Sequence, residues 1–326
     1  MADAPRKVTD YLSREEIRTL VTPTNREGWL ALAITWSIIG FAMILAAWFP
    51  HPATIILALI LIGGRQLGLA ILMHECAHRS LFRTRALNDW VGKWLCAEPV
   101  WQHLAQYRAH HMEHHNHTGT ERDTDLGLTA PFPVSRASLT RKFLRDLTAI
   151  AGIKRVIALI AMDLGYIEYT ASVGAKPIDQ KGRSWGHVVK TGFQNLGPVL
   201  LTNALLLGIL TAFGQAWLYL LWIGAYLTTF SLFLRIRSMA EHACTERTPD
   251  MFRNTRTTYA NWLARLTVAP HRVNYHLEHH LLMTVPHYRL PRMHRLLRER
   301  GALKESPVAE NYRKVIKQLV LKPVSG

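Results

Sequence analysis

The sequence predicts an all-α integral membrane protein with four transmembrane helices in two hairpins and a helical cap on the cytoplasmic side. Long uncharged apolar runs alternate with stretches dense in arginine, histidine and aspartate. The runs come in two pairs whose members are separated by only a few residues, and the basic residues avoid them. Because 49% of the 326 residues are hydrophobic, the segregation of these residues, more than their number, indicates a membrane protein.

The N-terminal segment, residues 1–28, is polar and precedes the first apolar run. It lacks the apolar core of a signal peptide. Ser13 and Glu16 have the spacing of a capping box, which predicts that a short helix begins there. We therefore expect this segment to stay on the cytoplasmic side.

Four apolar runs are long enough to span a bilayer. A hydrocarbon core of about 30 Å requires roughly 20 helical residues at about 1.5 Å per residue. The runs cover residues 29–48, 53–73, 196–213 and 216–234. Each pair is joined by a short connection, at residues 49–52 and 214–215, and is therefore expected to form a hairpin that returns to its starting side.

Because both hairpins return, the polar parts of the chain are expected to share one side of the membrane. These parts are residues 1–28, 74–195 and 235–326. We divide the chain into a cytoplasmic N-terminal segment, a membrane domain and a cytoplasmic C-terminal tail, which cover residues 1–28, 29–300 and 301–326. The three cysteines all fall on this inner side and are too few for a disulfide framework, so we expect free thiols.

The formal net charge of +16 raises the question of a nucleic-acid partner. Of the 39 lysines and arginines, only Arg65 lies within an apolar run, and neither outer connection contains any. This is the positive-inside distribution of a membrane protein, here expected in a bacterial inner membrane, and it requires no polyanion. Arg65 itself must face protein or water. A shorter run at 156–162, flanked by Lys154, Arg155 and Asp163, predicts an interfacial helix.

Histidines form three clusters on the predicted cytoplasmic side. The first is a pair four residues apart, and the other two share the pattern His-x2-His-His. On a helix each pattern places its imidazoles on one face, so we expect each triplet to supply three ligands to one metal. The eight imidazoles exceed the needs of one ion, and redox chemistry at a membrane favours iron among the metals that imidazole binds. The predicted ligands are His74, His78, His111, His114, His115, His276, His279 and His280.

The order of these clusters between paired apolar runs resembles the membrane fatty acid desaturase family, over about residues 30–300. The local sequences are similar to those of the acyl-lipid branch of this family. They are His-Glu-Cys-Ala-His at 74–78, His-His-Asn-His-Thr-Gly at 114–119, and Val-Pro-His-Tyr at 285–288. The resemblance implies two non-haem irons, O2 as co-substrate and a further ligand near the end of the fourth run, here His242. Animal stearoyl-CoA desaturases have an asparagine four residues before that histidine, where this chain has Ser238.

Several polar residues beside the clusters are candidates for contacts behind the metal ligands, and no catalytic residue separate from the ligands is predicted. The carboxylates either orient ligating imidazoles or pair with cations on solvated faces, and both alternatives stay open. His110 and His117 point away from the face of His111, which favours outer or surface roles. The candidates are Glu75, His110, Glu113, His117, Asp123, Asp125, Asn274 and Glu278.

The function that the resemblance implies is O2-dependent desaturation of a fatty acyl chain, lipid-linked or free. The sequence has no dinucleotide-binding glycine pattern, cysteine-rich iron–sulfur motif or haem motif, so we expect an external ferredoxin or cytochrome to donate electrons. A hydroxylase or ketolase with the same diiron site is an alternative. A remote alternative is a membrane zinc metalloprotease that uses His74, Glu75 as general base, and His78.

Overall fold

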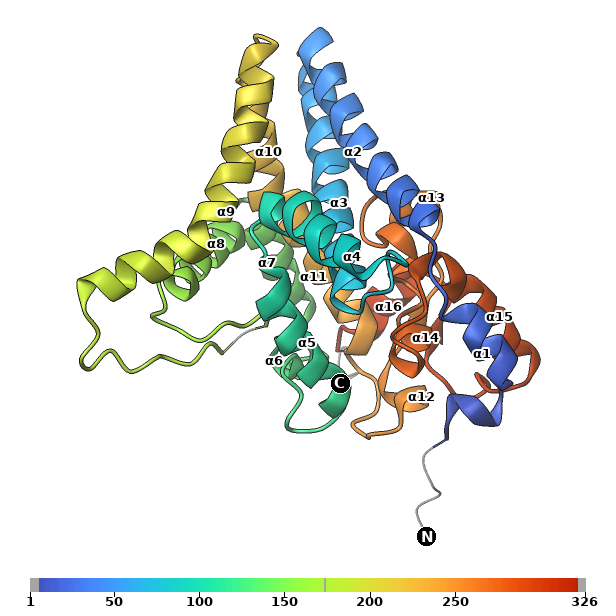
Figure 1. Cartoon of the computed structure of the whole chain (residues 1–326). Coiled ribbons are helices and arrows are strands. Elements are labelled where there is room, and N and C mark those ends of the chain that lie inside the picture. Colours follow the sequence, from blue (N-terminus) through green and yellow to red (C-terminus); the bar gives the residue numbers. More distant parts are fainter. Residues whose placement is uncertain (1–5, 173, 322–326) are drawn as a thin grey trace.

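The computed structural model describes residues 6–172 and 174–321, and its regular secondary structure is almost all helical. Within these residues, the strands are β1 (Thr257–Thr258) and β2 (Val308–Ala309), which pair in parallel. Long helices extend from one end of the molecule and shorter helices gather at the other (Figure 1). Among the described residues, four helices are long and apolar enough to cross a membrane, as the sequence predicts.

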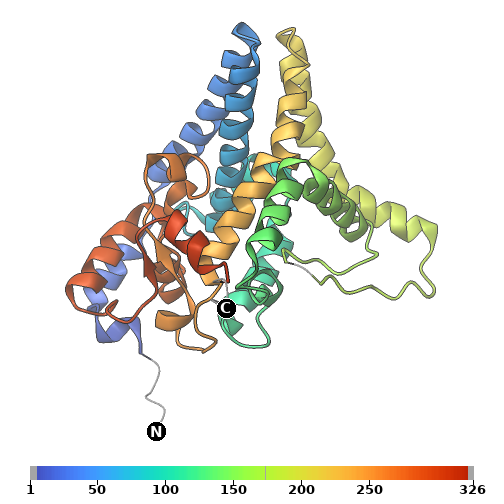
Figure 2. The same cartoon turned by 180° about the vertical axis from the view of Figure 1, so that it is seen from behind.

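The first two long helices are α2 (Asn25–Trp48) and α3 (Pro52–Ala77), which lie side by side (Figures 1 and 2). Both include polar residues beyond the apolar runs, because a helix continues through such residues once it leaves lipid. Thr24 caps α2 by accepting a hydrogen bond from the Glu27 amide. Proline opens α3, where its missing N–H costs nothing.

The other long elements are α9 (Trp185–Ala212) and the pair α10 (Leu218–Leu227) and α11 (Thr229–His242). Figure 1 shows that α9 changes direction about midway, and Pro198 lies inside it. Proline removes one backbone hydrogen bond and crowds the preceding turn, which accounts for the bend.

Shorter helices complete the end of the molecule where the histidines lie. They are α1 (Arg14–Leu20), α4 (Arg85–Val91), α5 (Leu104–His117), α6 (Leu126–Thr129), α7 (Arg136–Leu147), α8 (Ile150–Asp163), α12 (Met251–Asn254), α13 (Trp262–Leu266), α14 (His276–Leu281), α15 (Leu290–Glu299) and α16 (Tyr312–Gln318). Single turns are η1 (Val8–Asp10), η3 (Glu98–Val100), η4 (Pro270–Arg272) and η5 (His287–Arg289), and η2 (Gly92–Ala97) is a π-helix. The capping box predicted for α1 is confirmed, since the Ser13 hydroxyl accepts from the Glu16 amide and the Glu16 carboxylate from the Ser13 amide.

Arg65 is buried on α3 and faces protein, as the cost of a charge in lipid requires. Its guanidinium donates hydrogen bonds to the carbonyl oxygens of Arg265 and Leu266, both at 2.8 Å. These carbonyls end α13, where the negative pole of the helix dipole favours a cation. Gly64, one residue before, allows this contact, because a Cβ there would lie 2.2 Å from the Leu266 oxygen.

Candidate metal centre

Four helices converge on the histidine clusters. His74 lies in the last turn of α3 and His78 caps it, while His242 is the last residue of α11. The two triplets lie on α5 and α14. The structure brings all nine predicted ligands into two neighbouring groups, and within each group one ring nitrogen per residue lies within 4.8 Å of the others. Group one is His74, His78, His111, His115 and His279, and group two is His114, His242, His276 and His280.

Each His-x2-His-His triplet is divided between the two groups, which corrects the expectation that one triplet serves one metal. Of the triplet on α5, His111 and His115 enter group one, and the middle histidine, His114, enters group two. On α14 the arrangement is reversed, with His279 alone in group one. At about 100° per residue, positions i and i+4 lie about 40° apart around a helix, whereas i+3 and i+4 lie about 100° apart. The triplets therefore interlock two adjacent sites.

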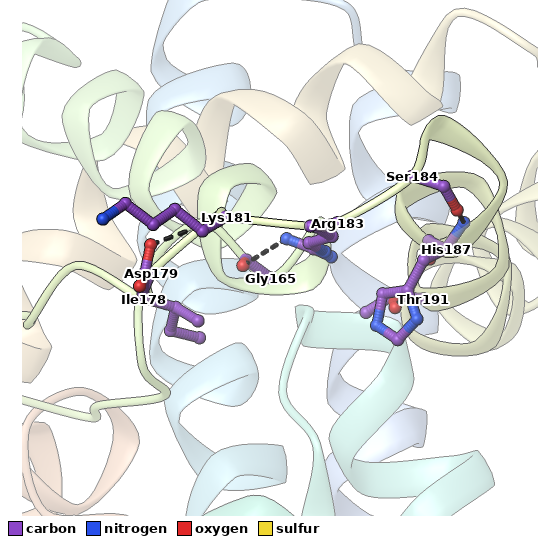
Figure 3. Close-up of a pocket in the computed structure, with 9 residues that line it drawn as sticks. Gly165, Ile178, Asp179, Lys181, Arg183, Ser184, His187 and Thr191 are labelled. Carbon is purple, nitrogen blue, oxygen red and sulfur yellow. Dashed lines mark hydrogen bonds between the residues drawn. The ribbon is translucent and has the colours of Figure 1, made fainter.

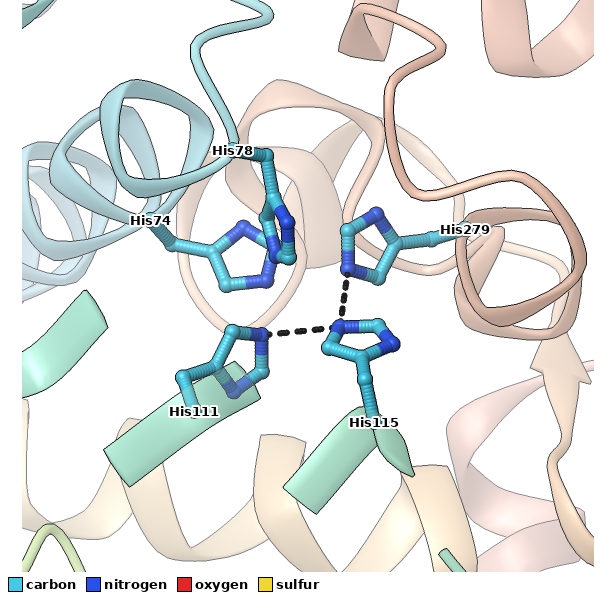
Figure 4. A group of neighbouring side chains, drawn as sticks. All are labelled: His74, His78, His111, His115 and His279. Carbon is cyan, nitrogen blue, oxygen red and sulfur yellow. Dashed lines mark hydrogen bonds between the residues drawn. The ribbon is translucent and has the colours of Figure 1, made fainter. Parts of the chain in front are cut away.

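The nitrogen spacings fit binding to a common ion. Nε2 of His115 lies 3.0 Å from Nε2 of His111 and 3.1 Å from Nε2 of His279 (Figure 4). In group two, Nε2 of His276 lies 2.9 Å from that of His242 and 3.1 Å from that of His280. Two nitrogens at about 2.1 Å from one ion and at right angles are separated by about 3.0 Å.

Burial keeps most of these imidazoles neutral, which metal binding requires. The pKa of His111, His115 and His279 lies well below the ordinary value because burial disfavours the charged form and neighbouring histidines repel it. Burial lowers the pKa of His78 to about 4. Both ring nitrogens of His74 and of His78 lack a hydrogen-bond partner among the described residues, a costly state that a bound ion would relieve.

The electrostatic surroundings of His114 are different. Burial alone would lower its pKa, but a hydrogen bond to Asp123 and the charge of Asp125 outweigh burial and raise it. The Nδ1 of His114 lies 2.6 Å from the Asp123 carboxylate, which leaves Nε2 for a metal. Asp125 lies 4.0 Å from the same Nδ1 and 3.1 Å from Nε2 of His110. Asp123 is thus in direct contact with a predicted ligand.

The other predicted partners have different contacts. Glu75 accepts the backbone N–H of His287 at 2.9 Å, and its other oxygen lies 4.0 Å from Nδ1 of His74. Glu278 is fully buried and binds Nδ1 of His294 at 2.6 Å. Glu113 and His117 form a pair at the surface, and Asn274 donates to the Thr258 carbonyl.

Three contacts behind group two were not predicted. Glu241 lies 3.4 Å from Nδ1 of His276, and Arg237 holds its carboxylate at 2.7 Å. The i, i+4 spacing of Arg237 and Glu241 was a signal in the sequence for this ion pair. The Asn254 carbonyl lies 3.1 Å from Nδ1 of His242. A carbonyl only accepts, so Nδ1 donates and Nε2 is left for a metal.

The Ser238 hydroxyl donates its hydrogen bond to the Leu234 carbonyl at 2.9 Å and therefore not to the imidazoles. A surface hollow of about 520 Å³ lies by the loop before α9, and none of the nine histidines lines it (Figure 3). Arg183, which lines it, is already engaged by the Gly165 carbonyl.

Helices of membrane-spanning length, together with two polyhistidine groups that could each hold a metal ion, are typical of membrane-bound, histidine-rich enzymes. The family model described as fatty acid desaturase matches residues 46–313, and the chain belongs to this family. The family is membrane-bound and known for diiron sites, and membership makes the chain an oxidoreductase.

Individual relatives are similar at low identity. A dihydrorhizobitoxine desaturase of Bradyrhizobium elkanii is 28% identical over 82% of this chain and 74% of its own length. An sn-1 oleoyl-lipid 12-desaturase of Anabaena variabilis is 24% identical over 82% of this chain and 75% of its own. A beta-carotene ketolase of Paracoccus is 25% identical over 80% of this chain and 88% of its own.

Proposed function

We propose that the chain catalyses O2-dependent desaturation of a fatty acyl lipid at a non-haem diiron centre held by the nine histidines. The observation that carries the proposal is the division of nine imidazoles into adjacent groups of five and four, with fitting nitrogen spacings. Imidazole binds several transition metals, and redox work on hydrocarbon favours iron. The four-membered group has the smaller ligand set and is the better candidate for an open coordination position.

The irons would supply O2 activation and hydrogen removal, and the protein would bind the irons and orient the acyl chain beside them. The overall reaction takes up O2, two electrons and two protons, removes one hydrogen from each of two neighbouring carbons, and releases two waters. An external ferredoxin or cytochrome provides the electrons. Asp123 and the Asn254 carbonyl each hold the Nδ1–H of one ligand, His114 and His242 respectively, which fixes ring orientation and presents Nε2.

The membrane arrangement that we propose has two hairpins, α2 with α3 and α9 with α10–α11, and the histidines on the cytoplasmic side. Large apolar side chains cover the outer surfaces of these helices, among them Phe41, Leu205 and Leu220, as contact with lipid requires. The exposed Trp185 and Phe193, two turns apart on the first half of α9, support placement of that half at the inner interface.

Desaturation is preferred to ketolation or hydroxylation for two reasons that agree. The local sequences of the histidine clusters resemble the acyl-lipid branch, and an oleoyl-lipid desaturase is among the relatives. The ketolase among them keeps oxygen insertion as the second candidate. A zinc protease is disfavoured, since His74 and His78 share their group with three further imidazoles and leave no place for a peptide and water.

Lipid analysis of a host expressing the chain tests the reaction. Acyl chains should become lighter by two hydrogen atoms, and a host expressing His114→Ala should not show this product. Products heavier by one oxygen atom would move the assignment to hydroxylation. An unchanged lipid profile with a fully iron-loaded protein would contradict an acyl-lipid substrate.

A further inference from the structure

Group two has one partly exposed member. Eight of the nine histidines are buried, and the ninth, His242, is half-buried. A pocket of about 80 Å³ lies against His242, at the surface between the loop that follows α5 and the loop that follows α11. Its exposed rim includes Cys244, Glu246 and Arg247. Water therefore approaches the histidine groups most closely at this place.

The pocket is polar where it meets the metal centre. Asp123, which holds His114, and Asn254, whose carbonyl holds His242, both line it. The Thr245 hydroxyl, also in the lining, donates to the backbone carbonyls of His242 and Asn254. Such a lining can hydrogen-bond water but offers little to a methylene chain.

Hydrogen bonds and close backbone contacts hold the two loops that form the walls of the pocket. The Asn254 side chain donates to the Thr118 carbonyl and to the Thr248 carbonyl, which ties the two loops together. Gly119 lies between them in the left-handed region at φ +78°, and a Cβ there would come within 2.3 Å of the Thr248 oxygen. The two loops therefore pack in direct contact, and the pocket stays narrow.

The size of the pocket decides what can use it. A water molecule needs roughly 10–15 Å³ of such volume, so the pocket holds several waters. Sites for organic ligands usually enclose about 300–1,000 Å³, well above the volume found here.

We propose that this pocket is the solvent port of the metal centre, through which water and anions of similar size reach group two beside His242, while the acyl chain approaches by another route. The inference rests on the proposed function, because desaturation consumes two protons and releases two waters and so needs an aqueous connection to a buried site. The five imidazoles of group one are all buried.

Cys244 provides a means of closing the port in the folded protein. It is exposed and lines the pocket, whereas Cys76 and Cys96 are buried. A maleimide should therefore react at Cys244 alone and place a bulky group at the rim. Cys244→Ser is the matched control, because it keeps a small side chain and loses the thiol.

The test measures how fast azide binds to the iron-loaded, detergent-purified protein, followed by the charge-transfer absorption of iron-bound azide. We expect alkylation to slow azide association at least tenfold in the native chain and to leave the treated Cys244→Ser protein unchanged. Leu126→Trp, which narrows the pocket from the opposite wall, should slow association without any reagent.

The outcomes separate the two proposals. An unchanged azide rate after stoichiometric alkylation, verified by mass spectrometry, would overturn the port while leaving the diiron centre intact. Failure of Cys244 to react would also overturn it, since the rim would then not be open. A purified chain without iron would instead contradict the proposed function, and the port with it.

Discussion

Nε2 of His242 lies 2.9 Å from Nε2 of His276, although the two residues are 34 positions apart and belong to different helices. His242 lies outside the three histidine clusters of the sequence, and this contact places it within group two. His242→Ala should therefore lower the iron content from about two to about one per chain and abolish product, while the protein still inserts in the membrane. Iron analysis and lipid profiling check this. His187→Ala, at an exposed position in the first turn of α9, is the control. Full iron and normal turnover in His242→Ala would show that eight histidines suffice.

Asp123 tests the role of the carboxylate behind a ligand. Asp123→Ala removes the acceptor for the Nδ1–H of His114, so we expect iron affinity to fall about 10–100-fold. Competition with a chelator measures the affinity. Glu113→Ala, on the exposed side of the same cluster, should bind iron normally. Equal affinities in the two variants would remove Asp123 from the site.

A buried ion-pair cluster at the start of α5 predicts a pH dependence of stability. Nε2 of His103 lies 2.7 Å from Asp163, and Nδ1 lies 3.6 Å from Glu98. Burial alone would lower the pKa of His103, but these carboxylates outweigh it and raise the pKa to about 9. Because the pKa is raised on folding, His103 contributes its full stabilisation below the unfolded pKa of about 6.5. This stabilisation is lost as the pH rises through about 9.

The native chain should therefore lose on the order of 2 kcal/mol relative to His103→Gln between about pH 6.5 and pH 9. Thermal unfolding in detergent across this range measures the difference. His187→Gln, which changes an exposed histidine, should follow the native curve. Parallel curves for the native chain and His103→Gln would mean that the ion pairs contribute no stability.

Membrane sidedness can be tested by labelling in a Cys244→Ser background. A cysteine at His51, between α2 and α3, should react with an impermeant thiol reagent added outside intact cells. A cysteine at Glu113, on α5, should react only after the membrane is opened. The opposite pattern would place the histidine groups outside the cell and contradict a cytoplasmic electron donor.

Much of the site follows from local patterns. Four apolar runs give four helices of spanning length, and the spacing of histidines on α3, α5 and α14 determines which imidazoles share a face. The angular separation of the middle histidine from i and i+4 follows from the spacing, but the division of each triplet between two groups was not predicted. Which histidines of other helices meet each side of α5 and α14 depends on tertiary packing, which the local sequence does not contain.

Contacts between distant segments were missed for the same reason. His287 and His294 lie outside the clusters, yet the backbone of His287 holds Glu75 and the ring of His294 holds Glu278. An isolated histidine in a sequence gives no sign of the carboxylate that tertiary packing will bring to it. The ion pair of Arg237 and Glu241 was accessible from its spacing, but its contact with His276 was not.

The central claim is that the two histidine groups hold two irons. Metal analysis of the purified chain, expressed with ample iron and zinc, tests it most directly. About two irons per chain and little zinc are expected, with loss of iron in His114→Ala and in His279→Ala alike, since these residues belong to different groups. One zinc per chain and no iron would contradict the diiron centre.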